Sequence, residues 1–307
     1  MSIVKPVIKW VGGKTQILEE VLAAFPRVID NYYEPFVGGG SVLLGLLSYC
    51  KAGEIRVGGN IYVGDANLNL IAMYKNIQSD VDNIITELRK LSEEYAMCPD
   101  NKIKDINRKL ITTEQSQLSK EHYYYWIRSK YNALTDNERT LSSASAMFIF
   151  LNKTGFRGLY REGPNGYNVP FGNYKNPSIY SEDHIKIVSD IIKDVIFINT
   201  SYENLISDVY QGDFIYLDPP YAPETGNSFV SYTSAGFSME NHEILFSLCN
   251  QLNSKNVKFV MSNADVELIY KHFDRNIYTI KTISCKRCIN SKNPDARVNE
   301  VLIANAS

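Results

Sequence analysis

The stretch IYLDPPY begins as an apolar strand at Ile215 and ends on an acid, two prolines and Tyr221. Asp218 offers a carboxylate, and Pro219 and Pro220 stiffen the backbone behind it because each ring holds φ at about −65° and removes an N–H. The carboxylate and the neighbouring main-chain carbonyl could accept both hydrogens of one NH₂ group and aim its lone pair. Tyr221 adds a flat face for a planar ring. A strand-ending Asp before proline is often only a turn, but the complete D-P-P-Y favours chemistry on an amino group.

A second candidate site lies in EPFVGGGS, where Gly38–Gly40 stand between a predicted strand and a predicted helix. Glycine lets the main chain approach a ligand closely at such a turn. Asp65 ends the next predicted strand, the usual position of an acid that binds ribose hydroxyls. Leu43 stands where a dinucleotide fingerprint needs its third glycine. Either feature alone is more often a tight turn or a helix cap, but together they suggest an adenosine-containing cofactor without pyrophosphate.

The stretch GGKTQ ends like a phosphate loop, but that reading fails on its spacing. The loop pattern G-x-x-x-x-G-K-[ST] requires glycine at the position of Ile8, and too little chain precedes it for the required strand. We therefore exclude a nucleoside triphosphatase. Trp10 and Lys14 remain an aromatic ring and a cation beside a double glycine. A helix start with a packing tryptophan explains them equally well.

Composition sets broad limits on the class of protein. The chain has 307 residues, of which 44% are hydrophobic and 21% charged, as expected of a globular protein with a large core. No apolar run is long enough for a membrane span, and MSIVKPVIKW lacks the features of a secretory signal. Five irregularly spaced cysteines suggest a reducing compartment. The single C-x-x-C from Cys285 to Cys288 lacks the partners of a zinc site, so we expect no metal.

Charge is uneven along the chain although the net charge is only −2. Residues 151–175 contain four cations and one anion, a net +3, and residues 281–297 contain five cations and one anion, a net +4. Two basic segments could form one surface for a polyanion, although basic loops often serve solubility alone. Charge by itself does not decide between these alternatives.

Strand and helix signals alternate at both ends of the chain, and helical periodicity alone fills residues 68–150. We expect an α/β sheet interrupted by a helical insert, followed by a long irregular segment, residues 152–176, of the kind that often carries function. The expected domains are a catalytic domain, residues 1–67 and 181–307, and an inserted recognition domain, residues 68–180. The predicted strands are residues 31–35, 60–64, 195–199, 213–217, 257–262, 276–284 and 299–304; the predicted helices around the sheet are 14–24, 41–49, 182–192, 239–253 and 266–272.

Eight motifs together resemble one known family, the Dam-type (D12 class) site-specific DNA adenine-N6 methyltransferases of the alpha-group motif order. The resemblance spans nearly the whole chain, with the motifs in register. They are KWVGGK (9–14), EPFVGGGS (34–41), VGDANLNLI (63–71), LNKTGFRGLYR (151–161), YNVPFGNYKNP (167–177), SYENL (201–205), DPPYAP (218–223) and ISCKRCINSKNPDARVNEVLI (283–303).

The resemblance implies a Rossmann-like class I S-adenosylmethionine-dependent methyltransferase sheet with an inserted, mostly helical DNA-recognition domain. It implies S-adenosylmethionine as cofactor, S-adenosylhomocysteine as product and no metal. Asp218, Pro219, Pro220 and Tyr221 match the catalytic motif. The residues that match cofactor positions are Trp10, Gly12, Gly13, Lys14, Glu34, Phe36, Gly38, Gly40, Asp65, Ser201, Tyr202 and Asp218.

The resemblance also implies double-stranded DNA as substrate, with the target adenine turned out of the helix. Phe156 matches the aromatic residue that wedges into the duplex, where tyrosine is frequent, and Asn173 stands where arginine is common. Lys9, Leu159, Arg161 and Pro170 match positions that read GATC. The remaining predicted DNA contacts are Arg157, Tyr174, Lys286 and Arg287.

Four alternatives stay open within this resemblance. The same acceptor motif suits another short DNA sequence, an RNA or a protein amide, and a homologue that only binds DNA would keep the fold. A DNA substrate predicts a location in the cytoplasm with the nucleoid, not secretion or a membrane. A cognate restriction endonuclease is a candidate partner.

Overall fold

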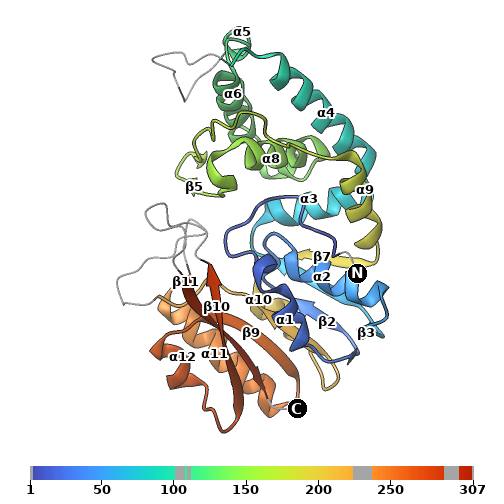
Figure 1. Cartoon of the computed structure of the whole chain (residues 1–307), viewed down its shortest axis with the longest axis vertical. Helices are drawn as coiled ribbons and strands as arrows, with labels where there is room; N and C mark the ends of the chain where they lie inside the picture. Colours follow the sequence, from blue (N-terminus) through green and yellow to red (C-terminus); the bar gives the residue numbers. More distant parts are fainter. Residues whose placement is uncertain (1–2, 101–107, 109–111, 224–236, 287–296, 306–307) are drawn as a thin grey trace. The chain divides into compact units, whose positions relative to one another are not determined.

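The computed structural model describes residues 3–100, 108, 112–223, 237–286 and 297–305 (Figure 1). The chain divides into two compact units. The sheet unit comprises Met1–Ile3, Lys14–Ala66 and Asp194–Ser307, and the helical unit comprises Val4–Gly13 and Asn67–Lys193. Each unit is built from segments that are not contiguous in sequence.

The sheet unit is organised around a mostly parallel β-sheet. Its strand order among the described residues is β10-β11-β9-β8-β2-β4-β7. The strands from β9 to β7 are parallel to their neighbours, whereas β11 runs antiparallel to both β9 and β10. The bounds are β2 Tyr32–Glu34, β4 Ile61–Asp65, β7 Val195–Asn199, β8 Phe214–Leu217, β9 Lys258–Ala264, β10 Tyr278–Lys286 and β11 Arg297–Asn305.

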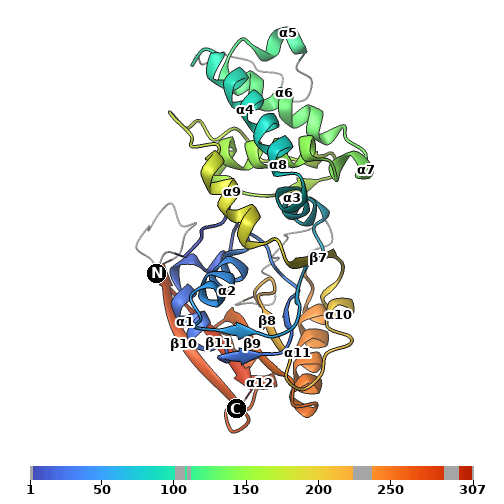
Figure 2. The ribbon, with the colours of Figure 1, turned by 90° about the vertical axis from the view of Figure 1, so that its right-hand side faces the viewer.

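Helices cover both faces of this sheet (Figure 2). The first face carries α1 and α2, and the second carries α10, α11 and α12. Strand β8 shows the reason, because its side chains alternate: Phe214 and Tyr216 pack in the core with α1 and α2, while Ile215 and Leu217 pack in the core with α11. The bounds are α1 Leu18–Ala23, α2 Ser41–Lys51, α10 Tyr202–Leu205, α11 Met239–Ser254 and α12 Glu267–His272.

The strand order changes direction at β2, which pairs with β4 on one side and with β8 on the other. Ligands of parallel α/β sheets bind outside the carboxyl ends of the strands at such a switch point. Glu34 ends β2, Asp65 ends β4, and Asp218 follows β8 directly. The fold therefore brings three predicted site residues to the same edge of the sheet.

The helical unit packs long helices around a tyrosine-rich and phenylalanine-rich core. Helix α8 packs against α3, α4 and α6, and the fully buried side chains include Tyr124, Phe148 and Phe150. Several helices begin at a side-chain cap; the Asn67 side chain, for example, accepts hydrogen bonds from the Asn69 and Leu70 amides at the start of α3. The bounds are α3 Leu68–Ser79, α4 Val81–Met97, α5 Thr113–Ser116, α6 Lys120–Asn132, α7 Asp136–Arg139, α8 Ser142–Thr154 and α9 Glu182–Ile191.

The compact units differ from the expected domain boundaries in two stretches and at Asn67, which belongs to the helical unit. Residues 4–13 and 181–193 belong to the helical unit. Helix α9 packs against α3 and α4, with Arg89 paired to Glu182 at 3.0 Å and the Gln78 side-chain NH₂ donating to the Ile192 carbonyl at 2.6 Å. These contacts, made across long sequence separations, leave no signal in the local periodicity of the chain.

The expectation that residues 152–176 lack regular structure was wrong. Helix α8 continues to Thr154, a 3-10 turn (η2 Phe156–Gly158) follows, and β5 (Glu162–Gly163) pairs with β6 (Gly166–Tyr167) as a short hairpin. Gly166 takes a left-handed conformation at the hairpin turn, with φ 84°. The Asn132 side chain fixes the hairpin by accepting from the Tyr167 amide and donating to the Tyr167 carbonyl.

Smaller differences concern short elements. The predicted helix of residues 14–24 is divided into a 3-10 turn, η1 Lys14–Gln16, and α1. Strands β1 (Val28–Ile29) and β3 (Arg56–Val57) form a small parallel pair that the sequence did not predict. No helix among the described residues is long and apolar enough to cross a membrane.

Candidate active site and candidate DNA-reading segment

The acceptor loop, residues 218–222, follows the fully buried strand β8 and begins with a buried ion pair. The Lys14 ammonium lies 2.7 Å from Asp218 Oδ1, with side-chain exposures of 3% and 18%. The Lys14 amide donates to Ser41 Oγ at 3.0 Å, which ties η1 to the start of α2. Burial raises the pKa of Asp218 to about 6; Lys14 opposes this rise and Glu300 adds to it. Asp218 is therefore ionised above about pH 6.

The aromatic end of the acceptor loop is held by two side chains that the sequence did not single out. The Tyr221 hydroxyl donates to Glu300 Oε2 at 2.5 Å, and the Ala222 amide donates to Asn263 Oδ1 at 2.9 Å. The Lys14 ammonium lies over the Tyr221 ring, 4.9 Å from its centroid. A carboxylate inside the apolar stretch VNEVLI was the available signal for Glu300, because an acid seldom stands in a buried strand without a partner.

Glu34, predicted as a cofactor residue, is buried at the end of β2 with 2% exposure. Its carboxyl group accepts a hydrogen bond from the Tyr32 hydroxyl at 2.8 Å. Burial raises the pKa of Glu34 to about 8; the Tyr32 hydrogen bond lowers it in part and the charge of Asp218 raises it. Glu34 therefore holds a proton at neutral pH, while Asp218 beside it does not.

The glycine turn between β2 and α2 is fixed by Asp65. The Gly38 amide donates to Asp65 Oδ2 at 3.0 Å, and the Asn199 side chain donates to the Asp65 carbonyl at 2.9 Å. Gly38 and Gly40 have φ values of 47° and 73°, the left-handed region that favours glycine. The turn thus depends on glycine for its backbone shape and on Asp65 for its position.

An aromatic cluster lies in the same unit. Phe36 and Tyr202 are stacked with ring centroids 5.3 Å apart, and Phe237 packs edge-on against Phe36 at 6.2 Å. Ser201 begins α10, and its hydroxyl accepts from the Asn204 amide. Phe36, Ser201 and Tyr202 were predicted cofactor residues, whereas Phe237 was not predicted.

The other predicted cofactor residues, Trp10, Gly12 and Gly13, belong to the helical unit. Trp10 stacks on Tyr160 with centroids 5.2 Å apart, and the Gly13 amide donates to the Trp10 carbonyl at 3.2 Å. Gly12 is left-handed with φ 80°. Their assignment to the cofactor stays a prediction from the family resemblance.

Lys9 is anchored to the reading segment, residues 152–176, by its main chain. Its amide donates to Asn152 Oδ1 at 2.9 Å, and the Asn152 side-chain NH₂ donates to both the Lys9 and Gly158 carbonyls, at 2.8 and 2.9 Å. The Lys9 ammonium lies 5.5 Å from the centroid of the Tyr174 ring. Gly158 is left-handed, and a Cβ built on it would lie 2.7 Å from the Lys9 Cβ.

The tip of the reading segment exposes an aromatic ring beside a cation. Phe156 is 43% exposed, and the Arg157 guanidinium carbon lies 5.3 Å from its ring centroid. Arg157 has φ 58°, a strained conformation for a non-glycine residue, and its amide donates to the Tyr174 hydroxyl at 2.8 Å. The Phe156 amide donates to the Pro170 carbonyl, so the backbone of the tip is held on both sides.

Arg161 is exposed beside the hairpin. Its Nε donates to Asn168 Oδ1 at 2.6 Å, which aligns the guanidinium. The Leu159 carbonyl accepts from the Tyr167 hydroxyl at 3.2 Å. The structure thus brings Lys9, Phe156, Arg157, Leu159, Arg161, Pro170 and Tyr174 together in one unit.

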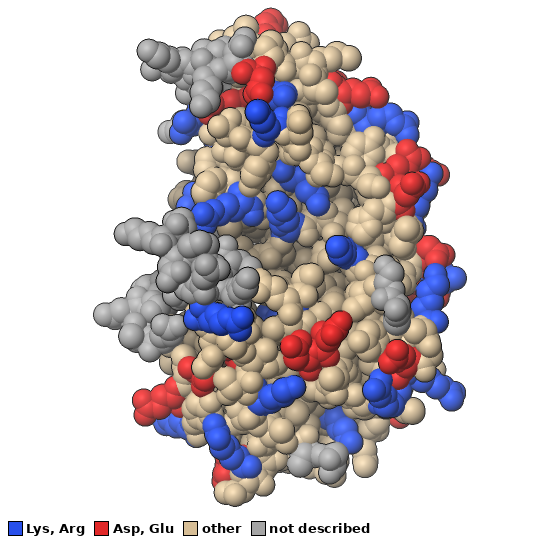
Figure 3. Space-filling model, in the orientation of Figure 1, with Lys and Arg blue, Asp and Glu red and all other residues tan. Residues whose placement is uncertain are grey.

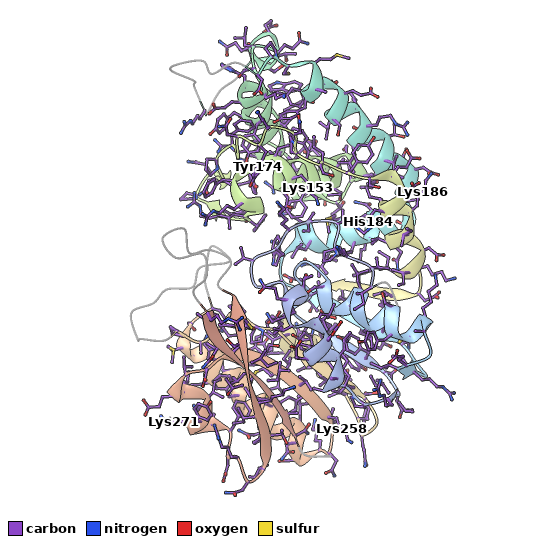
Figure 4. All side chains as sticks on the ribbon, viewed as in Figure 1. Lys153, Tyr174, His184, Lys186, Lys258 and Lys271 are labelled. Atoms are coloured by element: carbon purple, nitrogen blue, oxygen red, sulfur yellow. The ribbon has the colours of Figure 1, made fainter. Side chains whose placement is uncertain are left out.

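Basic side chains gather on this part of the helical unit. Figure 3 shows grouped Lys and Arg side chains there, and Figure 4 shows Lys153 and Tyr174 near α8 in the same orientation. Burial lowers the pKa of Lys153, and the charge of Lys9 lowers it further. The two cations repel each other, so an anion bound between them would be stabilised.

Most of the second basic segment, residues 281–297, lies outside the described residues. Arg287 and Cys288 lie outside the described residues. Lys286 is the last residue of β10, and in the sheet register its Cα pairs with that of Arg297. Within the described part of the chain, no three His, Cys, Asp or Glu side chains are grouped as a metal site.

The sheet order, the antiparallel β11 between β9 and β10, and the glycine turn after β2 define the fold of class I S-adenosylmethionine-dependent methyltransferases, as predicted. The D12 class N6 adenine-specific DNA methyltransferase family matches residues 10–287, and the chain belongs to this family. It is an adenine-specific DNA methyltransferase. The predicted family and enzyme class are thereby confirmed.

Similar proteins carry names that agree with this class. The Type II methyltransferase M.MjaIII of Methanocaldococcus jannaschii is 34% identical over 98% of this chain and 99% of its own length. The Type II methyltransferase M1.LlaDCHI of Lactococcus lactis subsp. cremoris is 29% identical over 98% and 95%. The DNA adenine methylase of Haemophilus influenzae is 28% identical over 96% and 90%.

Proposed function

We propose that this methyltransferase transfers a methyl group from S-adenosylmethionine to adenine N6 within GATC in double-stranded DNA, after turning the adenine out of the helix. One observation carries the proposal for the acceptor site. The Lys14 ammonium, a nitrogen that bears hydrogens, lies between the Asp218 carboxylate and the face of the Tyr221 ring. An extruded adenine would present its NH₂ group to the same two partners.

The acceptor loop would hold N6 with two oxygens. The Asp218 carboxylate and the Pro219 carbonyl would each accept one hydrogen of the NH₂ group, and Tyr221 would stack on the base. Pro219 and Pro220 would keep the acceptors from turning away because their φ angles are fixed. The Lys14 ammonium must then leave Asp218, since both cannot use the same oxygen at once. Orientation of the reacting atoms would supply much of the rate.

The residues at the carboxyl ends of the strands fit S-adenosylmethionine. The Asp65 carboxylate suits the two ribose hydroxyls, and the Gly38–Gly40 turn, held by Asp65, lets the main chain come close to the ligand. Phe36 and Tyr202 supply aromatic faces for the adenine ring. When bound, the sulfonium supplies an electrophilic methyl group. Lys14, Glu34 and Ser201, with Trp10, Gly12 and Gly13, complete the proposed set from the family resemblance.

The helical unit would read the DNA. We assign base-edge contacts to Lys9, Leu159, Arg161 and Pro170, because arginine suits a guanine edge and an apolar side chain suits the thymine methyl group. The exposed Phe156 ring would enter the duplex. Arg157, Tyr174, Lys286 and Arg287 would bind the backbone. Extrusion of the base is required because N6 inside the helix stack cannot reach the methyl group.

Methylation mapping in cells tests the target sequence. The full chain would be expressed in a host without adenine methylation, and every N6-methyladenine in the host DNA would be located. We expect modification of the adenine in GATC, and none with an Asp218→Ala variant. Modification in a different motif would replace the GATC assignment and keep the chemistry.

Competition tests the substrate class. Unlabelled GATC duplex should suppress methyl transfer to a labelled GATC duplex, whereas single-stranded DNA, RNA and glutamine peptides should not. Suppression by RNA or peptide would favour an alternative substrate. Two similar proteins are named Type II methyltransferases, so a restriction endonuclease that cuts the same sequence is a candidate partner, and acting on cellular DNA would place the protein with the nucleoid.

A further inference from the structure

Glu300 lies in β11, between β9 and β10 in the sheet, and none of the proposed catalytic or cofactor roles uses it. Its Oε2 accepts the Tyr221 hydroxyl hydrogen at 2.5 Å, across 79 residues of sequence. A hydrogen bond from a neutral hydroxyl to a carboxylate is stronger than one between neutral groups. Tyr221 is therefore tied to a fixed position on a strand of the sheet.

A second contact fixes the main chain of the same loop. The Ala222 amide donates to Asn263 Oδ1, and Asn263 is fully buried at the end of β9. Since Asn263 holds the backbone, the Glu300 bond has a separate effect: it sets the tilt of the Tyr221 ring and the charge next to it. Burial, with the charges of Asp218 and Glu300, raises the pKa of Tyr221 well above its usual value, so the hydroxyl keeps its proton and remains the donor.

The charges alternate in a row across this site. The Glu300 carboxylate binds the hydroxyl end of Tyr221, the ring face carries the Lys14 ammonium at 4.9 Å, and that ammonium binds Asp218. A carboxylate on the phenol hydroxyl increases the electron density of the ring, which strengthens its attraction for a cation on its face. The structure already shows such a cation in place.

We propose that Glu300 is a positioning residue for methyl transfer, which acts through the Tyr221 hydroxyl to orient the ring and to favour positive charge on the nitrogen above it. This inference rests on the proposed roles of Asp218 and Tyr221. During transfer, N6 bonds to the methyl carbon, the carbon–sulfur bond breaks with its electron pair left on sulfur, and N6 then releases one proton to water. Positive charge thus passes to N6 while it lies against Tyr221.

A double-mutant cycle tests this inference on the full-length enzyme with a GATC duplex. Glu300→Gln keeps an oxygen that can accept from the hydroxyl but removes the charge, and Tyr221→Phe keeps the ring but removes the hydroxyl. We expect Glu300→Gln to lower the single-turnover rate roughly tenfold, with the affinity for S-adenosylmethionine nearly unchanged. In the Tyr221→Phe background the same change should have no further effect on the rate.

A matched control is available in the helical unit. The Tyr123 hydroxyl donates to Glu94 at 2.7 Å, the same type of bond in another place, so Glu94→Gln makes the same chemical change. We expect the single-turnover rate of Glu94→Gln to equal that of the wild type. Equal losses for Glu94→Gln and Glu300→Gln would reduce the effect to stability and overturn the proposal.

Two further readouts separate positioning from a general loss of folding. With 2-aminopurine in place of the target adenine, Glu300→Gln should weaken the fluorescence quenching that stacking on Tyr221 causes. The acidic limb of the pH–rate profile should move to lower pH in Glu300→Gln, because removing a nearby negative charge lowers the pKa of Asp218. The charged groups that act on the pKa of Asp218 are Lys14, which lowers it, and Glu300, which raises it. The charge of Asp218 in turn raises the pKa of Glu34, Tyr216 and Tyr221.

The outcomes distinguish this inference from the proposed function. If Asp218→Ala is inactive while Glu300→Gln has the wild-type rate, the role of Glu300 is refuted and the acceptor site stands. A rate loss of equal size in the wild-type and Tyr221→Phe backgrounds would also refute it. If Asp218→Ala keeps the wild-type rate, the proposed function of the acceptor loop fails first.

Discussion

The acceptor loop of the sheet unit and the reading segment of the helical unit differ in how their charges are paired. Lys14 and Asp218 are nearly removed from solvent and neutralise each other. Lys9 and Lys153 are like charges close enough for one to lower the pKa of the other. In the first arrangement each charge has a partner of opposite sign, which a bound amino group would have to displace, whereas the second would be stabilised by an incoming anion. The difference leads us to expect that substrate binding exchanges one partner of Asp218 for another at the acceptor loop, and adds a missing counter-charge at the reading segment.

The two regions nevertheless share one design in their backbones. Asn263 holds the acceptor loop at Ala222, and Asn152 holds the reading segment at Lys9 and Gly158. In both cases a buried asparagine forms hydrogen bonds with main-chain groups. It therefore holds the backbone and not the side chains that would contact the substrate. A backbone held in this way helps to keep the attached side chains in fixed positions, which precise binding requires.

The largest expected effect comes from breaking the buried pair. Asp218→Ala should reduce methyl transfer by about 10³-fold or more, because N6 loses its charged acceptor, while the affinity for S-adenosylmethionine changes only a few-fold. Transfer of labelled methyl groups and isothermal titration measure the two quantities. DNA affinity at the reading segment should be retained. Near-normal turnover in this variant would refute the role of Asp218.

A control is needed because Asp218→Ala also breaks the ion pair between Asp218 and the Lys14 ammonium, which is only 3% exposed. Removing one member of a buried ion pair costs about 3–5 kcal/mol, so the unfolding temperature must be measured with the rate. Asp218→Asn retains a neutral oxygen for Lys14 and should keep part of the activity. An Asn variant with no activity and normal stability would show that the negative charge itself is required.

The sequence predicted the parts of the site that are formed locally. Strand β8 and the prolines after it determine where Asp218 and Tyr221 lie, and the alternation of strand and helix signals located Asp65 at the end of β4. These features depend on neighbours within a few residues. The same reasoning predicted the order of the elements in the sheet unit.

The partners of these residues could not be predicted in the same way. Glu300 reaches Tyr221 across 79 residues, and Asn152 reaches Lys9 across 143. Such pairs depend on which strands and loops become neighbours, and one sequence contains no direct record of that. The hairpin of residues 162–167 was missed for the same reason, since the distant Asn132 side chain holds it.

A change in the reading segment should reduce sequence discrimination and largely keep the maximal rate, the reverse of a change in the acceptor loop. Arg161→Ala should reduce discrimination at one base pair by about 1–3 kcal/mol and leave the maximal rate on GATC within a few-fold. Methylation rates on duplexes with each single substitution in GATC measure this. Arg27→Ala, which removes an exposed arginine of the sheet unit, serves as the charge control. An unchanged preference would remove Arg161 from the readout.

Phe156 tests the link between reading and chemistry. Phe156→Ala removes the exposed ring proposed to fill the duplex, and a lost stacking contact should lower the fraction of extruded adenine about twentyfold. Fluorescence of 2-aminopurine at the target position reports extrusion. Phe156→Tyr is the matched control, since it keeps the ring and should retain extrusion. Equal fluorescence for wild type and Phe156→Ala would assign the wedge to another residue.

The smallest effect concerns the proton that Glu34 binds near the acceptor loop. The folded pKa of Glu34 is about 8, against an ordinary value of 4.5, so the folded protein binds this proton more tightly than the unfolded chain does. The resulting stabilisation is fully present below pH 4.5 and is lost as the pH rises through 8.

From pH 7 to pH 9, wild type should therefore lose about 1.4 kcal/mol of unfolding free energy that Glu34→Gln does not lose. Urea unfolding of both proteins at the two pH values measures the difference. Glu182→Gln is the control and should lose as much unfolding free energy between pH 7 and pH 9 as wild type does. Hydrogen bonds from Lys186 and Arg89, together with the charge of Lys186, lower the pKa of Glu182, so it stays ionised over this range. Parallel pH dependences for wild type and Glu34→Gln would show that the proton is not held at Glu34.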